Sequence, residues 1–168
     1  MVTKSPLRFT LLVVGMVWTL AACASTQSRG LPAEVLRTPE GFAEWQRGEE
    51  VLKKEVQATH EQYKRENSLK SLKEYETAVR DYLDHGFSLF RVYQGSHLTL
   101  PDNLIVSLEQ RTGLFMDVAD EYIKHGSLAV GEGIASDVVH NYSDLPVMAP
   151  AQRRAEAVLL RYRYRQDY

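Results

Sequence analysis

The chain has 168 residues, and its 20 Lys and Arg residues against 22 Asp and Glu residues give a formal net charge of −2. A balance so close to neutral argues against a bulk nucleic-acid binder, which needs a basic excess on one face. The roughly 130 residues from Thr38 onward suffice for one hydrophobic core and are too few for two comfortable domains.

The N-terminal residues have the three parts of a secretory signal peptide. Lys4 and Arg8 supply the positive start, an uncharged apolar run covers residues 9–20, and the small residues Ala21 and Ala22 precede Cys23. This order predicts export and cleavage. As a helix, the apolar run would span about 18 Å, whereas a hydrocarbon core of about 30 Å needs nearer twenty residues. A transmembrane helix is therefore disfavoured, and a short uncleaved anchor is the alternative.

The junction Leu20-Ala21-Ala22-Cys23 resembles the lipobox of bacterial lipoproteins. The resemblance implies cleavage between Ala22 and Cys23, a thioether-linked diacylglycerol on Cys23 and, in many such proteins, a third, amide-linked acyl chain such as palmitate. Cys23 is the only cysteine, so no disulfide framework is expected. In a Gram-negative host, Ala24 in place of aspartate after the cysteine implies the outer membrane, with the domain facing the periplasm.

Residues 23–37 are predicted to be the lipidated N-terminus and a flexible tether. Residues 25–30 are mostly polar and lack apolar periodicity, while Pro32 and Pro39 punctuate the end of the segment. Removal of residues 1–22 takes away two basic residues and leaves 18 basic against 22 acidic residues, a formal charge of −4. Residues 38–168 are then expected to form one helical domain.

The first long helix is predicted to open at Thr38 and Pro39, which have the residue types of a helix cap and first turn. Apolar residues follow at helical spacing: Phe42, Trp45, Leu52, Val56 and Tyr63. Acids placed four residues before bases predict a solvated outer face: Glu49 with Lys53, Glu50 with Lys54, and Glu61 with Arg65.

Further helices are expected along the rest of the chain. A break is predicted at Asn67-Ser68, and a capping box at Ser71 to Glu74 opens the second helix, which runs to about Tyr93. Pro101-Asp102 restarts the chain as a helix that His125-Gly126 ends. A shorter helix around residues 134–142 and a last one over about 151–165 complete the chain. No period-two strand pattern occurs, so the sequence predicts an all-α antiparallel bundle of four or five helices.

A six-residue pattern occurs twice, forty residues apart, as Asp81-Tyr82-Leu83-Asp84-His85-Gly86 and Glu121-Tyr122-Ile123-Lys124-His125-Gly126. Each copy places an acid four residues before a histidine, on one side of a helix. Carboxylate and imidazole groups from facing helices build metal centres in bundles. One hypothesis is therefore a metal-dependent or hydrolytic periplasmic enzyme that uses Asp81, His85, Glu121 and His125, with Asp137 and His140 as further ligands.

A structural interpretation of the repeat stays open beside the metal hypothesis. The tyrosines fall on apolar stripes, and His-Gly is common at helix ends. The usual di-iron pattern has glutamate three residues before histidine, and neither copy has it. A degenerate duplication of a helical hairpin is a further interpretation. We assign no catalytic, cofactor-binding or metal residue on this basis, and the four residues remain candidates.

The C-terminal segment Arg161-Tyr162-Arg163-Tyr164-Arg165 has an unusual alternating composition. One interpretation is contact with lipid phosphates or an anionic partner, with the tyrosines at the interface. The other is an amphipathic last helix whose tyrosines pack and whose arginines stay solvated or pair with Glu156.

The expected function is that of a membrane-anchored envelope lipoprotein whose helical domain is a structural or protein-interaction module. Its partners would be the membrane, through the lipid on Cys23, and an envelope protein, with no nucleic acid and no cofactor. A non-enzymatic role is expected because no nucleophile elbow and no phosphate-binding loop is present. The metal-dependent or hydrolytic enzyme is the alternative, and a binder of small apolar ligands between helices is a third possibility.

Overall fold

A computed structural model describes residues 33–142 and 149–166. In these ranges the chain forms a four-residue turn of helix and five long helices, with no strand: α1 (Ala33–Leu36), α2 (Pro39–Glu66), α3 (Leu69–Gly95), α4 (Asp102–Lys124), α5 (Leu128–Asn141) and α6 (Ala149–Gln166). The all-α prediction is therefore confirmed for this part of the chain. The predicted signal peptide and the lipobox lie outside the described residues.

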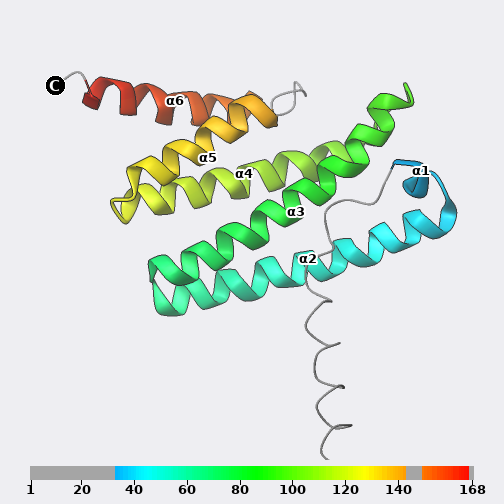
Figure 1. Cartoon of the computed structure of the whole chain (residues 1–168), viewed down its shortest axis with the longest axis horizontal. Helices are drawn as coiled ribbons and strands as arrows, with labels where there is room; N and C mark the ends of the chain where they lie inside the picture. The colour runs from blue at the N-terminus through cyan, green and yellow to red at the C-terminus, as the bar shows by residue number, and fades with distance from the viewer. Residues whose placement is uncertain (1–32, 143–148, 167–168) are drawn as a thin grey trace, which may run out of the picture.

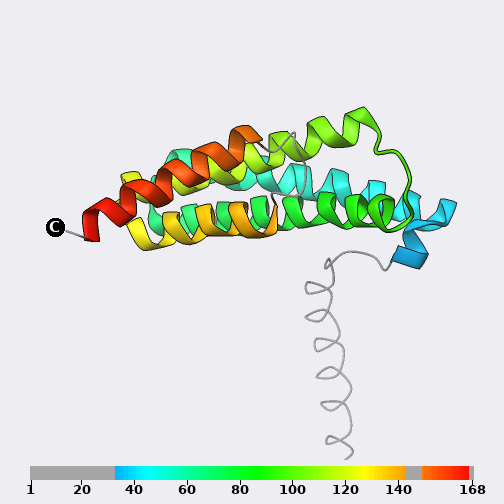
Figure 2. The same ribbon diagram turned by 90° about the horizontal axis from the view of Figure 1, so that it is seen from above.

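The long helices form two layers, which Figure 1 and Figure 2 show from two directions. α3 and α5 lie in one layer, and α2, α4 and α6 lie in the other. α3 packs on both α2 and α4, and α4 packs in addition on α5 and α6. Each long helix runs back along its predecessor (Figure 1), so the arrangement is an antiparallel bundle.

The start of α2 and the break before α3 follow from capping residues. Thr38 Oγ1 accepts a hydrogen bond from the Gly41 amide at 3.0 Å, as the sequence predicts. Asn67 ends α2 in the left-handed region, with φ 46°. Ser68 then caps α3, because its Oγ accepts from the Ser71 amide at 3.2 Å. The predicted break is confirmed, whereas the cap lies three residues before the predicted capping box.

The ends of α3 and α4 have the same hydrogen-bond pattern, the Schellman motif. At the end of α4, Gly126 has φ 79° and the Ser127 amide donates to the Tyr122 carbonyl at 2.8 Å. At the end of α3, His97 holds the equivalent position with φ 54°, and the Leu98 amide donates to the Tyr93 carbonyl at 3.1 Å. A glycine fits this left-handed position without strain, whereas a histidine does not.

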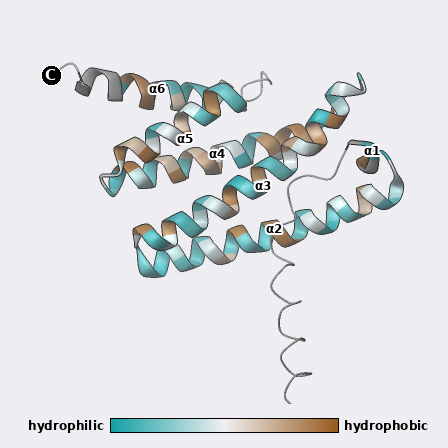
Figure 3. Cartoon of the chain, viewed as in Figure 1, coloured by the Kyte–Doolittle hydropathy of each residue, from teal (hydrophilic) through white to brown (hydrophobic). Residues whose placement is uncertain are grey.

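The hydrophobic core lies between the two layers. Figure 3 shows hydrophobic residues recurring along α3, α4 and α5, while α2 is largely hydrophilic. The residues with no exposed surface come mainly from α3 and α4: Leu72, Val79, Leu83, Leu108, Phe115, Met116, Val118 and Ala119. Because α3 and α4 are covered from both sides, they carry most of the apolar burial that stabilises the bundle.

The apolar face predicted for α2 is largely confirmed. Trp45, Leu52, Val56 and Tyr63 are buried. Phe42 is 36% exposed, although its ring stacks on Trp45 at a centroid distance of 6.0 Å. The N-terminal end of α2 therefore presents an aromatic side chain to solvent.

The packed domain begins before Thr38. Residues 33–36 form α1, and Leu36 is 5% exposed within the core. Arg37 Nη2 donates to Ser96 Oγ at 2.7 Å and so fastens this segment to the turn after α3. The predicted flexible tether thus does not extend to residue 37. Within residues 33–142 and 149–166, no helix has both the length and the apolar content that crossing a membrane requires.

Candidate binding groove between α2 and α4

A groove separates α2 from α4, and α3 forms its floor. No Cα atom of α2 lies within 8 Å of a Cα atom of α4, although both helices pack on α3. A cavity of about 200 Å³ lies between Trp45 of α2 and Leu104 of α4. A second cavity, of about 260 Å³, lies between Gln57 of α2 and Gln110 of α4. We call this surface the α2–α4 groove.

Arg111 of α4 lies between the two cavities and lines both. Its side chain is 1% exposed. The guanidinium donates to the Glu49 carboxylate of α2, to the Tyr82 carbonyl of α3 at 2.7 Å, and to Ser107 Oγ at 2.9 Å. It also lies over the Tyr82 ring, 3.8 Å from the centroid. One buried side chain therefore joins all three helices that form the groove.

Glu49 faces the interior of the groove, and the predicted pairing with Lys53 on an outer face is wrong. Its side chain is 18% exposed and its Oε1 accepts from Arg111. Its Oε2 is buried and has no hydrogen-bond partner among the residues that the structure describes. Helical spacing alone does not distinguish a solvated acid from one that meets a cation on another helix.

Gly86 permits the approach of Arg111. A Cβ atom at this position would lie 2.7 Å from Arg111 Nη1 and 2.9 Å from Leu108 Cδ2. Gly48 has a similar role one helix away, since a Cβ atom there would lie 3.0 Å from His85 Cε1. Two glycines inside helices thus make room for the polar groups below the groove.

His85 is 6% exposed and packs against α2. Its ring stacks on Trp45 at a centroid distance of 4.8 Å, and its Nε2 lies 2.9 Å from the Trp45 carbonyl oxygen. In return, Trp45 Nε1 donates to the His85 carbonyl at 3.1 Å. Burial lowers the pKa of His85, which the hydrogen bond to Trp45 offsets only in part. The neutral ring is therefore the form that the fold favours.

A second polar cluster joins α2 to α4 near the far end of the groove. Tyr63 Oη donates to Glu121 Oε2 at 2.7 Å and lies 3.0 Å from His125 Nε2. Burial, together with the hydrogen bond to Glu121, raises the pKa of Tyr63 to about 12. Hydrogen bonds from Lys124 and Tyr63 lower the pKa of the Glu121 carboxyl. This cluster closes the groove with groups that satisfy one another.

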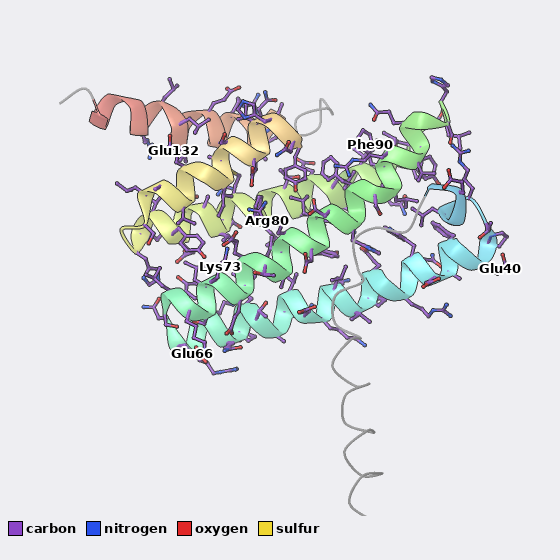
Figure 4. The ribbon with its side chains drawn as sticks, viewed as in Figure 1. Glu40, Glu66, Lys73, Arg80, Phe90 and Glu132 are labelled. Atoms are coloured by element: carbon purple, nitrogen blue, oxygen red, sulfur yellow. The ribbon has the colours of Figure 1, made fainter. Side chains whose placement is uncertain are left out.

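A third polar cluster lies on the opposite side of α3 from α2 and links α3 to α4 and α5. Glu76, with a side chain 4% exposed, accepts from Lys73 at 2.7 Å and from Tyr122 Oη at 3.0 Å. Arg80, labelled in Figure 4, donates to Asp137 of α5 at 2.8 Å. Burial alone would raise the pKa of Glu76, but hydrogen bonds from Lys73, Tyr122 and Arg80 outweigh it and lower the pKa. Every charged group here has a partner, so we interpret the cluster as structural.

The four residues of the metal hypothesis do not come together. His85 contacts α2 at Trp45, whereas Glu121 and His125 contact it at Tyr63. Those two positions on α2 are eighteen residues apart, about 27 Å along a helix axis. Asp81 is exposed. Among the described residues, no three His, Cys, Asp or Glu side chains are grouped in a way that suits a metal ion.

The further proposed ligands are also placed apart from a common centre. Asp137 pairs with Arg80, and His140 Nδ1 lies 2.8 Å from the Ser136 carbonyl oxygen of its own helix. Cys23 and Ala22 lie outside the described residues, and so do the side chains at 162–165 of the arginine–tyrosine tail. Arg161, the first residue of that tail, is exposed on α6.

Comparison with known proteins identifies no relative: no family model, no curated protein and no solved structure matches the chain. The function is therefore argued from the geometry of this chain. The groove offers a pair of partly apolar cavities on either side of a buried ion pair. Such an arrangement suits binding.

Two residues of the groove were missed by the sequence interpretation, Arg111 and Glu49. A signal for the first was present, because Gly86 stands inside a strong helical pattern where glycine is unfavourable. An isolated glycine in such a pattern often has a packing reason. The identity of the group that packs against it comes from a separate helix and is not contained in the local sequence.

Proposed function

We propose that this chain is a lipid-anchored protein of the bacterial cell envelope, attached to the outer membrane through Cys23 and facing the periplasm. Its helical domain serves as an interaction module that binds a partner protein in the α2–α4 groove. The lipobox resemblance at Leu20 to Cys23 supports the anchor. The groove supports the binding role, and this role is non-catalytic.

The observation that carries the binding role is the buried ion pair that crosses the groove. Arg111 and Glu49 occupy a place where two neighbouring helices of one layer would otherwise pack through apolar side chains. A buried ion pair contributes little net stability compared with apolar residues of similar volume. We therefore infer that the Arg111–Glu49 ion pair fixes the distance between α2 and α4, and so the shape of the groove.

The groove chemistry indicates what the partner contributes. An apolar side chain fits the cavity of about 200 Å³ beside Trp45 and Leu104. A hydrogen-bond donor beside it would lie next to the Glu49 side chain, which lines the same cavity and is 18% exposed. We therefore expect a partner segment that carries an apolar side chain next to an amide, ammonium or guanidinium group.

The anchor is tested by Cys23→Ala. Without the cysteine, the lipid cannot be attached, so we expect loss of incorporated radiolabelled acyl chains and accumulation of the unprocessed precursor. A variant that is still cleaved after Ala22 and still fractionates with membranes would refute the lipobox interpretation.

The binding role is tested by photocrosslinking in intact cells. A photoreactive amino acid is placed at Gln57 or Gln110, two exposed residues on the walls of the second cavity. The matched control carries it at Val130, exposed on α5 and outside the groove. We expect one discrete adduct shared by both groove positions and absent from the control. Equal adducts at all three positions, or none at any, would contradict a groove-specific partner.

A further inference from the structure

An apolar patch lies where α1 joins the bundle, and it shares Phe42 and Tyr93 with the first cavity of the α2–α4 groove. Leu98 in the turn after α3 is 59% exposed, and Phe42 of α2 is 36% exposed. Both side chains line a cavity of about 370 Å³, together with Pro39 and Tyr93. We call these four residues the α1-end patch. Exposed apolar side chains that share one hollow are more unusual than single ones scattered on a surface.

The turn that carries Leu98 contains a strained backbone conformation at His97. His97 adopts φ 54°, which is strained for a residue with a Cβ atom. That turn allows the Leu98 amide to bond the Tyr93 carbonyl at 3.1 Å. It leaves the Leu98 side chain at the rim of the cavity, largely outside the core.

The chain from the anchor enters the fold beside this patch. Leu36 is buried below it, and Arg37 bonds Ser96 two residues before Leu98. Ala33 is ten residues after Cys23 in the sequence, so at most about 36 Å of chain separates them. This limit holds whatever conformation that segment adopts.

The other end of the bundle is much farther from the anchor. α2 runs from Pro39 to Glu66, and a helix of that length spans about 42 Å. Figure 4 marks these two ends with the labels Glu40 and Glu66. Of the two ends of α2, the one that carries the α1-end patch is therefore nearer to Cys23 along the chain.

We propose that the α1-end patch rests on the phospholipid bilayer that holds the anchor, with Leu98 and Phe42 entering the boundary between headgroups and acyl chains. This inference rests on the proposed lipid anchor. A short tether makes the contact intramolecular, with an effective concentration of about millimolar, so it needs less apolar area than binding from free solution would.

The charges around the patch are of both signs, so the expected attraction to the bilayer comes mainly from the apolar side chains. Arg37 lines the cavity, and its neighbours in sequence include the exposed acids Glu34 and Glu40. Since both signs are present, the contact gains little from anionic lipids and depends little on salt.

The experiment uses the lipidated full chain in vesicles of phosphatidylethanolamine and phosphatidylglycerol. Leu98→Cys receives a nitroxide label, and Val130→Cys on α5, 41% exposed, is the matched control. Cys23 does not compete for the label, because its sulfur is in a thioether. Electron paramagnetic resonance then compares collisions of each label with oxygen, which concentrates in the bilayer, and with a water-soluble nickel chelate.

We expect the oxygen-to-nickel collision ratio to be several-fold higher at residue 98 than at residue 130, and unchanged when salt is raised. Equal ratios at the two positions, in protein that still floats with the vesicles, would overturn the patch contact and leave the anchor intact. Shielding of residue 98 from both reagents would also overturn it, because that result indicates a protein contact. Failure to float with the vesicles would instead refute the anchor, and with it this inference.

Discussion

The two copies of the acid–Tyr–x–x–His–Gly pattern have different surroundings in the fold. In α3, Gly86 lies inside the helix, where its missing Cβ admits Arg111. In α4, Gly126 lies after the last turn, with φ 79°. The first histidine is buried against Trp45, whereas the second bonds the hydroxyl of Tyr63 on the groove side of α4.

The difference shows that a matching six-residue pattern is not a matching site. Both histidines reach α2, but from antiparallel helices and at positions about 27 Å apart. The two copies also lie in different layers, since α3 and α4 do not share one (Figure 2). The first copy supports the floor of the α2–α4 groove, and the second ends a helix and closes the groove.

The largest expected effect comes from Arg111→Met. Removing the guanidinium leaves Glu49 partly buried without its cation, which costs about 3 kcal/mol of unfolding free energy. Urea denaturation followed by circular dichroism measures this change. Adding Glu49→Gln to the same protein should recover part of the loss, because the uncompensated charge is gone. A loss below about 1 kcal/mol for Arg111→Met would contradict the importance of the ion pair.

Gly86→Ala is expected to destabilise the protein by about 2 kcal/mol, since the new methyl group overlaps Arg111 and Leu108. Helix propensity alone predicts the opposite, a gain of about 1 kcal/mol. The sign of the change therefore distinguishes the two causes. In an Arg111→Ala background the cost should shrink or turn into a gain. The same loss in both backgrounds would contradict the proposed role of Gly86.

His85 should make the stability depend on pH. Its pKa is lowered in the folded protein relative to the ordinary value of 6.5, so below that pH the unfolded chain binds a proton that the folded chain does not. The unfolding free energy should therefore be highest above about pH 6.5 and fall toward pH 5, by at most about 1.4 kcal/mol per pH unit for each such histidine.

His85→Gln should flatten that slope, and His125→Gln is the matched variant that retains His85. Burial also lowers the pKa of His60, so this residue adds to the pH dependence of stability over the same pH range. Part of the slope of unfolding free energy against pH should therefore remain in His85→Gln. Urea denaturation between pH 5 and 7.5 gives the measurement. An unchanged slope in His85→Gln would show that burial of this ring is not coupled to protonation.

The smallest expected effects lie at the two helix ends. Gly126→Ala should lower the unfolding free energy by about 1 kcal/mol, because alanine is strained at φ 79°. No atom lies within 4 Å of the new methyl group, so backbone strain is the only expected cause. His97→Gly at the equivalent position after α3 should have the opposite sign and stabilise by up to about 1 kcal/mol. Thermal unfolding of the two variants beside the parent protein tests this pair. Changes of the same sign would contradict the strain argument.

Much of the fold follows from local sequence. Thr38-Pro39, Asn67-Ser68 and His125-Gly126 mark helix boundaries because caps and left-handed residues act on their own backbone. The apolar spacing of α2 identifies its buried side for the same reason. Local chemistry does not say which helices face each other. Helical spacing therefore predicts Lys53, four residues away, as the partner of Glu49, whereas the actual partner is Arg111 on another helix.

The candidate site was less accessible to sequence reasoning. Arg111 is charged and would ordinarily be expected on the surface, yet it is 1% exposed. Its burial depends on three groups from three helices, the Glu49 carboxylate, the Tyr82 carbonyl and the space at Gly86. Helical periodicity describes one helix at a time and gives no account of such a convergence.

The proposed lipid on Cys23, which would anchor this helical domain to a membrane, is tested most directly by mass spectrometry. The sample is the N-terminal peptide of protein extracted from the membranes of expressing cells. We predict that the mature chain begins at Cys23 and carries the added mass of a diacylglyceryl group, with or without a third acyl chain. A chain that begins elsewhere, or one that begins at an unmodified Cys23, would contradict the account.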